Sequence, residues 1–357
     1  MCKRLQGIMD NSPSRPRKKT QAVTIIDVAR ESGVSYSTVS RVLSGFEHVS
    51  DDAREKVLTA AGRLGYVVNV QARSLAGGRS RVVGVLVPAL DNGYILEVAR
   101  GIDEELNKEG YSLMLYTTHQ HGGKESQFVN AIANGLCDGL LLVVPLVPAS
   151  YLEVLQKRKF PFVLVDQADP TNNSSTVYAT NWQGAYDATT HLIDLGHRRI
   201  GLITGRMDLA SAIERLDGYK AALIDHKIPL DETMIVPGDF FQPTGYSGGQ
   251  HLLALPKPPT AIFAGNDLMA FGALQAAGER GLRVPDDLSI IGFDDIPHSV
   301  MVHPRLTTIH QPLDQMGRVS VRMLLDQIEQ PDKPVRHLTL GTRLILREST
   351  APPRSGS

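Results

Sequence analysis

The side chains whose chemistry is easiest to interpret lie between Tyr36 and Arg41, in the segment Tyr-Ser-Thr-Val-Ser-Arg. If this segment is helical, its hydroxyl and guanidinium groups share one face and Val39 points the other way. Hydroxyl groups reach base edges or phosphates by hydrogen bonds, and an arginine can bind guanine with two parallel bonds. The outward face would hold Tyr36, Ser37, Ser40 and Arg41. The pattern indicates a DNA-reading helix, and a solvated polar face without a partner is the alternative.

Capping signals on both sides predict the elements that would position this face. Thr24, with Asp27 three residues later, resembles a capping box and starts a helix that Gly33 ends. Ser35 then caps a second helix, which ends near Gly45. Two short helices joined by a tight turn that contains glycine form a helix-turn-helix.

A third helix completes the small domain that we expect at residues 24–65. Ser50 can cap this helix, with Asp51 and Asp52 in its first turn, and Gly65 ends it. The apolar side chains expected to close the core are Val57, Leu58, Ala61 and Leu64.

Charge is unevenly distributed along the 357 residues, although the formal net charge is only −1. Residues 1–81 contain 14 Lys and Arg against 7 Asp and Glu, whereas the remaining residues contain 23 Lys and Arg against 31 Asp and Glu. A basic head on an acidic body favours nucleic acid as a partner, and solvated charge without a partner explains it equally well. We expect residues 1–23 to form a disordered basic tail, because they contain few large apolar groups to bury.

From residue 82 onward, short apolar runs alternate with helix-length amphipathic segments. Repeated strand–helix–strand units predict a mainly parallel sheet with helices on both faces, and about 270 residues favour two such lobes. We expect a linker at 66–81, the two-lobed domain at 82–349 and a short tail at 350–357. The expected strands are 82–87, 113–116, 139–144, 162–165, 200–203, 261–263 and 289–293, and the expected helices are 95–109, 125–134, 182–195, 211–225 and 267–280.

Several protein classes are disfavoured by composition. No apolar run approaches the roughly 18 residues that a membrane helix needs. Residues 1–20 lack the apolar stretch of a secretory signal, so we expect a cytoplasmic protein with no membrane partner. Cys2 and Cys137 provide neither a disulfide framework nor zinc-ligand spacing, and we expect no metal site and no cofactor.

Taken together, these segments resemble bacterial transcription regulators of the LacI/GalR (lactose/galactose repressor) family. The similarity spans about residues 23–349. It implies an all-α helix-turn-helix headpiece followed by an α/β two-lobed domain like that of periplasmic binding proteins. The segments that carry the resemblance include Gly33-Val-Ser-Tyr-Ser-Thr-Val-Ser-Arg-Val, His48-Val-Ser, Cys137-Asp-Gly-Leu-Leu-Leu, Leu195-Gly-His-Arg-Arg-Ile, Glu214-Arg-Leu-Asp-Gly-Tyr, Gly265-Asn-Asp-Leu-Met-Ala and Val284-Pro-Asp-Asp-Leu-Ser.

The resemblance implies a repressor that binds double-stranded operator DNA as a homodimer under the control of a small-molecule effector. In the family a hinge helix, matched here by Val70–Ala76, becomes ordered in the minor groove, where Leu75 matches an apolar wedge between base steps. A flexible linker with an incidental leucine is the alternative. The residues that the family resemblance implies for DNA binding are Thr24, Ser35, Tyr36, Ser37, Thr38, Ser40, Arg41, His48, Asn69, Arg73 and Leu75.

The same resemblance places the effector between the lobes, where polar side chains follow strand ends. An arginine can donate to ligand oxygens, carboxylates accept from hydroxyls, and an aromatic ring can cover the apolar face of a sugar. Each polar residue could instead be a helix cap or part of a turn, with Asp267 as the expected cap beside Asn266. Core packing is the alternative for Phe240. The implied effector residues are Tyr94, Asp166, Ser211, Arg215, Phe240, Asn266 and Asp294.

Departures from the family pattern bear on the identity of the effector. Asn92-Gly-Tyr-Ile stands where Asn-Pro-aromatic-aromatic is common, and Val143 and Val144 are apolar. Leu209 and Ser211 occupy a loop where purine-binding relatives have a basic residue. A charged ligand would need more than one arginine, so a carboxylated purine is disfavoured. We expect a sugar or sugar-like effector, with a nucleoside as the second candidate.

Two rival function classes fit the sequence less well. Gly245-Tyr-Ser-Gly-Gly matches the G-x-S-x-G pattern of an esterase, yet no strand leads into it, and we expect a helix capped by Thr244. His119 and His121 lack the neighbours of a metal site, and His197-Arg-Arg follows a helix end. A plain solute-binding receptor would need an export signal and would have no use for residues 24–76. We therefore expect a regulator and no enzyme.

Overall fold

The structure is a computed structural model that describes residues 23–43, 48–66, 79–90, 92–118, 129, 132, 135–145, 149–167, 169 and 172–354. The chain divides into two compact units, residues 1–76 and 77–357, and each is described by itself. Some predictions fall outside the described residues, namely those on the tail before residue 23, on Gly45, on Asn69, Arg73 and Leu75, on His119 and His121, and on most of the helix at 125–134.

The headpiece consists of three helices, α1 (Ile25–Ser32), α2 (Tyr36–Leu43) and α3 (Asp51–Leu64). Thr24 and Asp27 form a capping box at the start of α1, and Gly33 ends it with a φ of 68°. The Ser35 hydroxyl accepts a hydrogen bond from the backbone N–H of Thr38 at 3.2 Å. The predicted caps at both helix starts are therefore confirmed.

Three valines meet at the centre of the headpiece, one from each helix: Val28, Val39 and Val57. The prediction that Leu58 belongs to this core is wrong, because its side chain is 55% exposed and Ala60 is buried instead. The buried positions of α3 follow the spacing of a single helix face, and Leu58 lies one residue away from that face.

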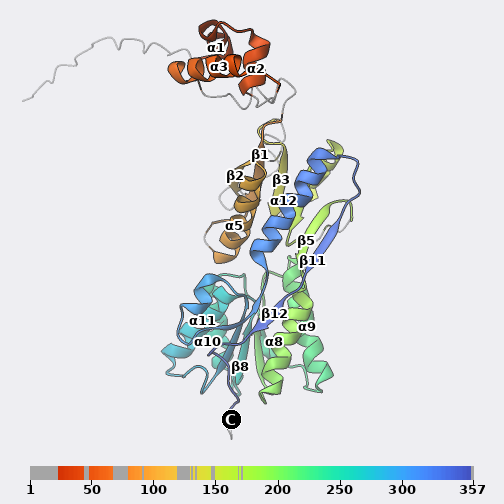
Figure 1. The fold of residues 1–357 in the computed structure, drawn as a ribbon. Helices are drawn as coiled ribbons and strands as arrows, with labels where there is room; N and C mark the ends of the chain where they lie inside the picture. Colours follow the sequence, from red (N-terminus) through yellow and green to blue (C-terminus); the bar gives the residue numbers. More distant parts are fainter. Residues whose placement is uncertain are drawn as a thin grey trace, which may run out of the picture. The chain divides into compact units, whose positions relative to one another are not determined.

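The first lobe of the larger unit is a parallel six-stranded sheet in the order β11-β5-β4-β3-β1-β2. Its core packs α5 and α12 against one face of that sheet (Figure 1). The elements are β1 (Val82–Val87), α5 (Gly93–Lys108), β2 (Ser112–Thr117), β3 (Gly139–Val143), α7 (Ala149–Lys157), β4 (Phe162–Val165), β5 (Ser175–Ala179), α12 (Leu313–Glu329) and β11 (His337–Leu340).

The second lobe is a six-stranded sheet in the order β12-β10-β9-β8-β6-β7, parallel except for β12. Helices α8 and α9 pack together on one face, and α10 and α11 pack on the other (Figure 1). The elements are α8 (Asn181–Asp194), β6 (Ile200–Ile203), α9 (Ala210–Asp225), η1 (Glu232–Met234), β7 (Ile235–Val236), α10 (Gln242–Leu253), β8 (Ala261–Ala264), α11 (Asp267–Glu279), β9 (Ser289–Asp294), η2 (Pro297–Val300), β10 (Thr307–His310) and β12 (Arg343–Ile345).

The chain passes between the lobes three times: from β5 to α8, from β10 to α12, and from β11 to β12. Two of the crossings are joined directly, since the hydroxyls of Thr180 and Thr342 lie 2.9 Å apart. The predicted all-α headpiece and two-lobed α/β domain are confirmed. No helix in the described part of the chain is long and apolar enough to cross a membrane.

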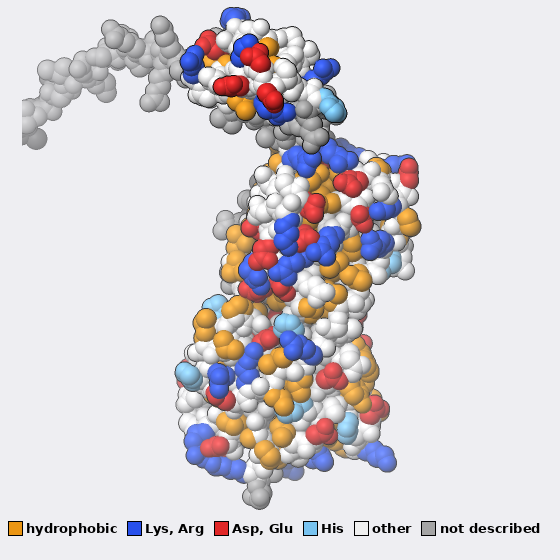
Figure 2. All heavy atoms as spheres, viewed as in Figure 1, with side chains coloured by type: hydrophobic (Ala, Val, Ile, Leu, Met, Phe, Trp, Pro, Cys, Tyr) orange, Lys and Arg blue, Asp and Glu red, His pale blue; other side chains and the backbone are white. Residues whose placement is uncertain are grey.

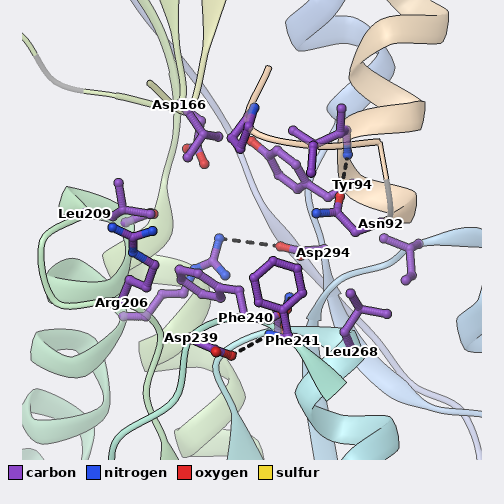
Figure 3. Close-up of a pocket in the computed structure, with 18 residues that line it drawn as sticks. Asn92, Tyr94, Asp166, Arg206, Leu209, Asp239, Phe240, Phe241, Leu268 and Asp294 are labelled. Atoms are coloured by element: carbon purple, nitrogen blue, oxygen red, sulfur yellow. Dashed lines mark hydrogen bonds and ion pairs between the residues drawn. The ribbon is translucent and has the colours of Figure 1, made fainter. Parts of the chain in front are cut away.

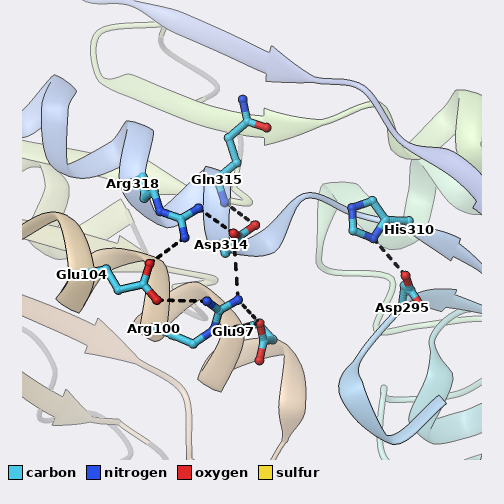
Figure 4. A network of polar contacts seen from close by, with 8 residues as sticks. All are labelled: Glu97, Arg100, Glu104, Asp295, His310, Asp314, Gln315 and Arg318. Carbon is cyan, nitrogen blue, oxygen red and sulfur yellow. Dashed lines mark hydrogen bonds and ion pairs between the residues drawn. The ribbon is translucent and has the colours of Figure 1, made fainter. Parts of the chain in front are cut away.

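Two glycines bring α5 and α12 into backbone contact. A Cβ atom added at Gly101 would lie 2.0 Å from the carbonyl oxygen of Asp314, and one at Gly317 would lie 2.3 Å from that of Val98. Beside this contact, Arg318 donates to Glu104 at 2.6 Å and pairs with Asp314 (Figure 4). The close approach fixes the start of α12, immediately after the chain enters the first lobe.

Candidate functional site

The outward face of α2 holds the side chains that the sequence predicted there. Tyr36 is 55% exposed, and Ser37 and Arg41 are also exposed. Ser40 and Thr38 are half-buried at the edge of this face. Ser35 and His48, at the flanks of α2, are exposed as well. The described side chains thus form a polar surface with a single arginine, suited to base edges and phosphates.

The polar groups of Thr24 have partners at the start of α1, just as the hydroxyls of Ser35, Ser37 and Thr38 have one another at the start of α2. The N–H and the hydroxyl of Thr24 both donate to the Asp27 carboxylate, at 2.9 and 2.7 Å. A hydrogen bond from Thr24 to a phosphate would therefore compete with the capping box.

A cavity of about 180 Å³ lies between the two lobes, and all seven residues expected at an effector site line it (Figure 3). Tyr94 and Asp166 come from the first lobe, at the start of α5 and the end of β4. The other five come from the second lobe, at a strand end, just before a helix or in the first two turns of one: Ser211, Arg215, Phe240, Asn266 and Asp294. Strand ends of both sheets face the same cavity, as expected for α/β sheets.

Arg215 is the most constrained side chain of this cavity. It is 4% exposed, and its Nε donates to Asn181 at 2.9 Å while Nη1 donates to the carbonyl of Gly265. The third nitrogen, Nη2, lies 3.4 Å from Asp294 Oδ1. The guanidinium group also lies over the ring of Phe293, 3.8 Å from its centre. These contacts hold the group in one orientation, which prepares it to donate to a ligand.

Two buried carboxylates face Arg215 from opposite lobes. Burial raises the pKa of Asp294 to about 8, although the positive charge of Arg215 opposes the shift. Burial also raises the pKa of Asp166. Asp166 Oδ1 and the hydroxyl of Tyr94 are buried without a hydrogen bond of ordinary geometry among the described residues, although the hydroxyl is near enough to lower the pKa of Asp166. Buried polar atoms are normally well satisfied, so these two groups can improve their hydrogen bonding by binding a ligand.

The helix-cap alternative is correct for Asn266 and wrong for Asp267. Asn266 caps α11 by accepting from the N–H of Met269 at 3.0 Å, and its amide donates to the carbonyl of Phe240. Asp267 is instead fully buried and accepts from Ser299 and from the N–H of Ile296. Asn266 has the β-region backbone that a cap requires, whereas Asp267 is already helical.

Among the lining residues that no sequence pattern predicted are two charged side chains and one aromatic ring: Arg206, Asp239 and Phe241. Arg206 is a second basic group, so the argument that only Arg215 could meet a charged ligand is wrong. Its guanidinium is nevertheless paired twice with Asp208. Arg206 lies shortly after β6, so the rule that polar residues follow strand ends could have found it.

Two expectations about motifs outside the cavity need correction. Thr244 does not cap α10, because the helix already begins at Gln242 and Thr244 donates to the carbonyl of Phe241. Ser247 of the G-x-S-x-G pattern therefore lies inside a helix. His197 is buried between Thr260 and Ser289, whereas Arg198 does bind the carbonyl of Ile193 at the end of α8.

The raised pKa of Asp294 predicts a pH dependence of stability. In the unfolded chain this carboxyl has its ordinary pKa of 3.8, so folding favours its protonated form. The stabilisation is complete below about pH 4 and is lost as the pH rises through about 8. We expect the wild type to lose at least about 1 kcal/mol relative to Asp294→Asn between pH 5 and 8. Urea unfolding of both proteins measures this, and a difference that is independent of pH would contradict the prediction.

Comparisons with known proteins agree with both parts of this arrangement. Residues 24–69 match the bacterial regulatory proteins of the lacI family, and residues 189–350 match a periplasmic binding protein-like domain. The chain is 37% identical over 329 residues to catabolite control protein A of Priestia megaterium, which covers 92% of this chain and 99% of that protein. The chain belongs to the lacI family of bacterial regulatory proteins.

Other members extend the comparison. The ribose operon repressor of Haemophilus influenzae is 38% identical, with 91% of this chain and 98% of that protein covered. The lac repressor dimer bound to operator has a TM-score of 0.81 at 31% identity, with 93% of this chain and 100% of that chain covered. A complex of the regulator CelR with cellobiose has a TM-score of 0.72 at 32% identity, with 92% of this chain and 99% of that chain covered. This lacI-family chain is a DNA-binding transcriptional regulator under the control of an effector.

Proposed function

We propose that this regulator is a repressor that binds its operator as a homodimer and responds to a sugar bound between its lobes. The cavity lined from both lobes by the seven expected side chains carries this proposal. Tyr36, Ser37 and Arg41 would read bases in the major groove, and Leu75 would act as the wedge in the minor groove. A symmetric dimer would place two such helices in successive major grooves of a near-palindromic operator.

The chemistry of the cavity supports a sugar as the effector. Arg215 donates, Asp166 and Asp294 accept, and Phe240 provides a ring that can cover an apolar face. A neutral polyol has many hydroxyls that can improve the hydrogen bonding of Asp166. Related structures contain cellobiose in CelR and ribose in a lacI-family regulator of Enterococcus faecium. A nucleoside, which also combines a ring face with ribose hydroxyls, is the second candidate.

One segment of the second lobe can transmit the effect of the ligand. Asp294 faces the cavity, whereas Asp295 faces away and binds His310 at 3.0 Å (Figure 4). Ile296 contacts the start of α5 in the first lobe, where a Cβ added at Gly93 would lie 3.2 Å from it. Both aspartates have positive φ, 113° and 60°, which limits how the segment can adjust. A ligand that moves Asp294 would therefore move the contact with α5.

Val300 and Met301 are at least half exposed on the second lobe, and Leu96 is exposed on the first, which offers apolar surface for a partner subunit. We infer that the chain acts in the cytoplasm, where its DNA is, and has no enzymatic activity of its own. The position of Ser247 inside α10 supports the second inference, since a nucleophile elbow needs a strand before the serine.

A binding selection tests the proposal. The full chain is used to select genomic DNA fragments, and operator affinity is then measured with a panel of sugars and nucleosides. We expect one sequence with two half-sites and a change in affinity with one sugar. Coupling is reciprocal, so that sugar must also bind with different affinity when operator is present. If no sugar changes the affinity for the selected operator, the effector is not a sugar. The selected operator would still support the role as a DNA-binding regulator.

A further inference from the structure

The cavity between the lobes contains more acidic than basic side chains. The charged residues among its described lining are three carboxylates and two guanidinium groups: Asp166, Asp239, Asp294, Arg206 and Arg215. Both guanidinium groups already have an acid, since Arg206 is paired with Asp208 and Arg215 lies 3.4 Å from Asp294. Neither Asp166 nor Asp239 forms an ion pair with a described residue. On the visible outer face of the two lobes, by contrast, acidic and basic side chains are interspersed (Figure 2).

Asp166 is the more deeply buried of the two unpaired acids. Its side chain is 3% exposed, whereas Asp239 is half-buried and accepts from the N–H of Phe241 and the hydroxyl of Thr244. Asp166 Oδ1 has no hydrogen bond of ordinary geometry with a described residue, and it lies with Tyr94 on the first-lobe side of the cavity (Figure 3). A buried carboxylate without a counter-charge is costly, so a ligand that supplies the counter-charge gains affinity.

The pKa values of the neighbouring carboxyls reflect the same excess of acid. Burial raises the pKa of Asp166, although the charge of Arg215 opposes the shift. Burial also raises the pKa of Glu214 to about 7, and the nearby charge of Asp166 raises it further. These carboxyls thus favour their protonated forms over sharing one guanidinium group. The hydroxyls of a neutral sugar would improve the hydrogen bonding of Asp166 but would leave its charge unmatched.

We propose that the effector is an amino sugar whose ammonium group binds the Asp166 carboxylate. This inference rests on the proposed function, which places a sugar between the lobes. An ammonium group supplies the missing charge together with three hydrogen-bond donors, whereas a hydroxyl supplies one donor and no charge. The neutral hydroxyls of the same sugar bind Arg215 and Asp294 from the second lobe.

The first measurement compares paired ligands on the wild-type full chain at pH 7, where an aliphatic amine is mostly protonated. D-glucose, D-galactose, D-mannose and D-ribose are each compared with the forms in which an amine replaces one hydroxyl. Calorimetry measures the affinity of the chain for each ligand, and operator affinity with and without the ligand identifies the effector. Charge-assisted hydrogen bonds are about twice as strong as neutral ones, so we expect one amino sugar to bind at least about 10-fold more tightly than its parent.

Asp166→Asn then separates the charge from the hydrogen bonding. Asparagine keeps the size of the side chain and one acceptor oxygen, and it tolerates the left-handed backbone at this position, where φ is 55°. The variant should lose at least about 10-fold in affinity for the amino sugar and less for the parent, so the ratio of the two affinities falls toward one. Urea unfolding checks that the variant is folded, and the wild-type comparison does not depend on it.

Glu153→Gln is the matched control, because it removes one negative charge from the same lobe outside the cavity. Glu153 is exposed on α7, where it pairs with Lys157. This variant should keep the wild-type ratio of affinities. An equal fall in the ratio for both variants would overturn the proposal, because the charge of the lobe and not Asp166 would then set the preference.

The remaining outcomes distinguish this proposal from the proposed function. If every parent sugar binds as tightly as its amino forms, the ammonium group is not recognised and this proposal is wrong. A parent sugar that changes operator affinity would in that case still support a repressor controlled by a neutral sugar. If neither the parents nor the amino forms bind, both the amino sugar and the sugar are excluded.

Discussion

Replacing Arg215 with alanine should abolish the response of operator binding to the effector, while binding without effector should persist. The guanidinium group is the buried donor of the cavity, fixed by Asn181, Gly265 and Asp294. Removing it deprives the ligand of charge-assisted hydrogen bonds and leaves Asp294 without its cation. Each such bond contributes about 1.5–3 kcal/mol, so effector affinity should fall by about 100-fold or more. The headpiece is a separate compact unit, so its contacts with DNA are retained.

Arg280→Ala provides the control for this prediction. Arg280 lies in the same lobe and also binds backbone carbonyls, those of Leu253 and Gln250, but it is not part of the cavity. Operator affinity against effector concentration, measured for both variants, separates loss of the site from general damage to the lobe. If Arg215→Ala still responds at wild-type effector concentrations, the arginine does not belong to the effector site.

Gly101→Ala should unfold or strongly destabilise the two-lobed domain. The new methyl group would overlap the carbonyl oxygen of Asp314, at 2.0 Å, and a backbone atom cannot move aside as a side chain can. Separating α5 from α12 would also disturb the ion pairs of Arg318 with Glu104 and Asp314. Overpacking in a core costs about 1–3 kcal/mol and sometimes more, and we expect a loss of about 3 kcal/mol.

Gly278→Ala is the matched substitution, since a Cβ there would have nothing within 4 Å. Alanine is the better helix former, so this variant should gain about 0.5–1 kcal/mol. Chemical unfolding of both variants compares the same added methyl group in two surroundings. Equal stabilities would show that α5 and α12 do not approach as closely as the structure describes.

Local signals were enough to predict most elements of secondary structure. Every expected strand is present within two residues of its predicted bounds, and so is each expected helix that the structure describes except α10, which begins three residues earlier than a cap at Thr244 would place it. Strands such as β1 and β3 consist of continuous apolar residues, because both faces of a parallel sheet are covered. The sequence pattern did not predict α7, α12, β5, β7, β10, β11 or β12. Strands β5 and β11 contain polar residues at half of their positions or nearly so, which conceals the apolar pattern.

The polar residues of the cavity were predictable for a related reason. Asp166 and Asp294 each end a buried strand, and the ends of parallel strands meet at one edge of a sheet. Resemblance to the family then selected seven residues, and all of them line the cavity. The effector assigned to those residues stays a prediction.

By itself the sequence determined the capped helices, the strands, the strand-end polar residues and the uneven charge, because each of these depends on a few neighbouring residues. Only the tertiary structure decided which polar groups were already used. Asn266 caps α11 while Asp267 is buried among hydroxyls, and Arg206 joins the cavity although Asp208 neutralises it. Whether a polar group already has a partner depends on residues far apart in the chain, which compete for the same hydrogen bonds. The contact of Gly101 with Asp314 is of the same kind, since 213 positions separate two residues that touch only after the chain has crossed between the lobes.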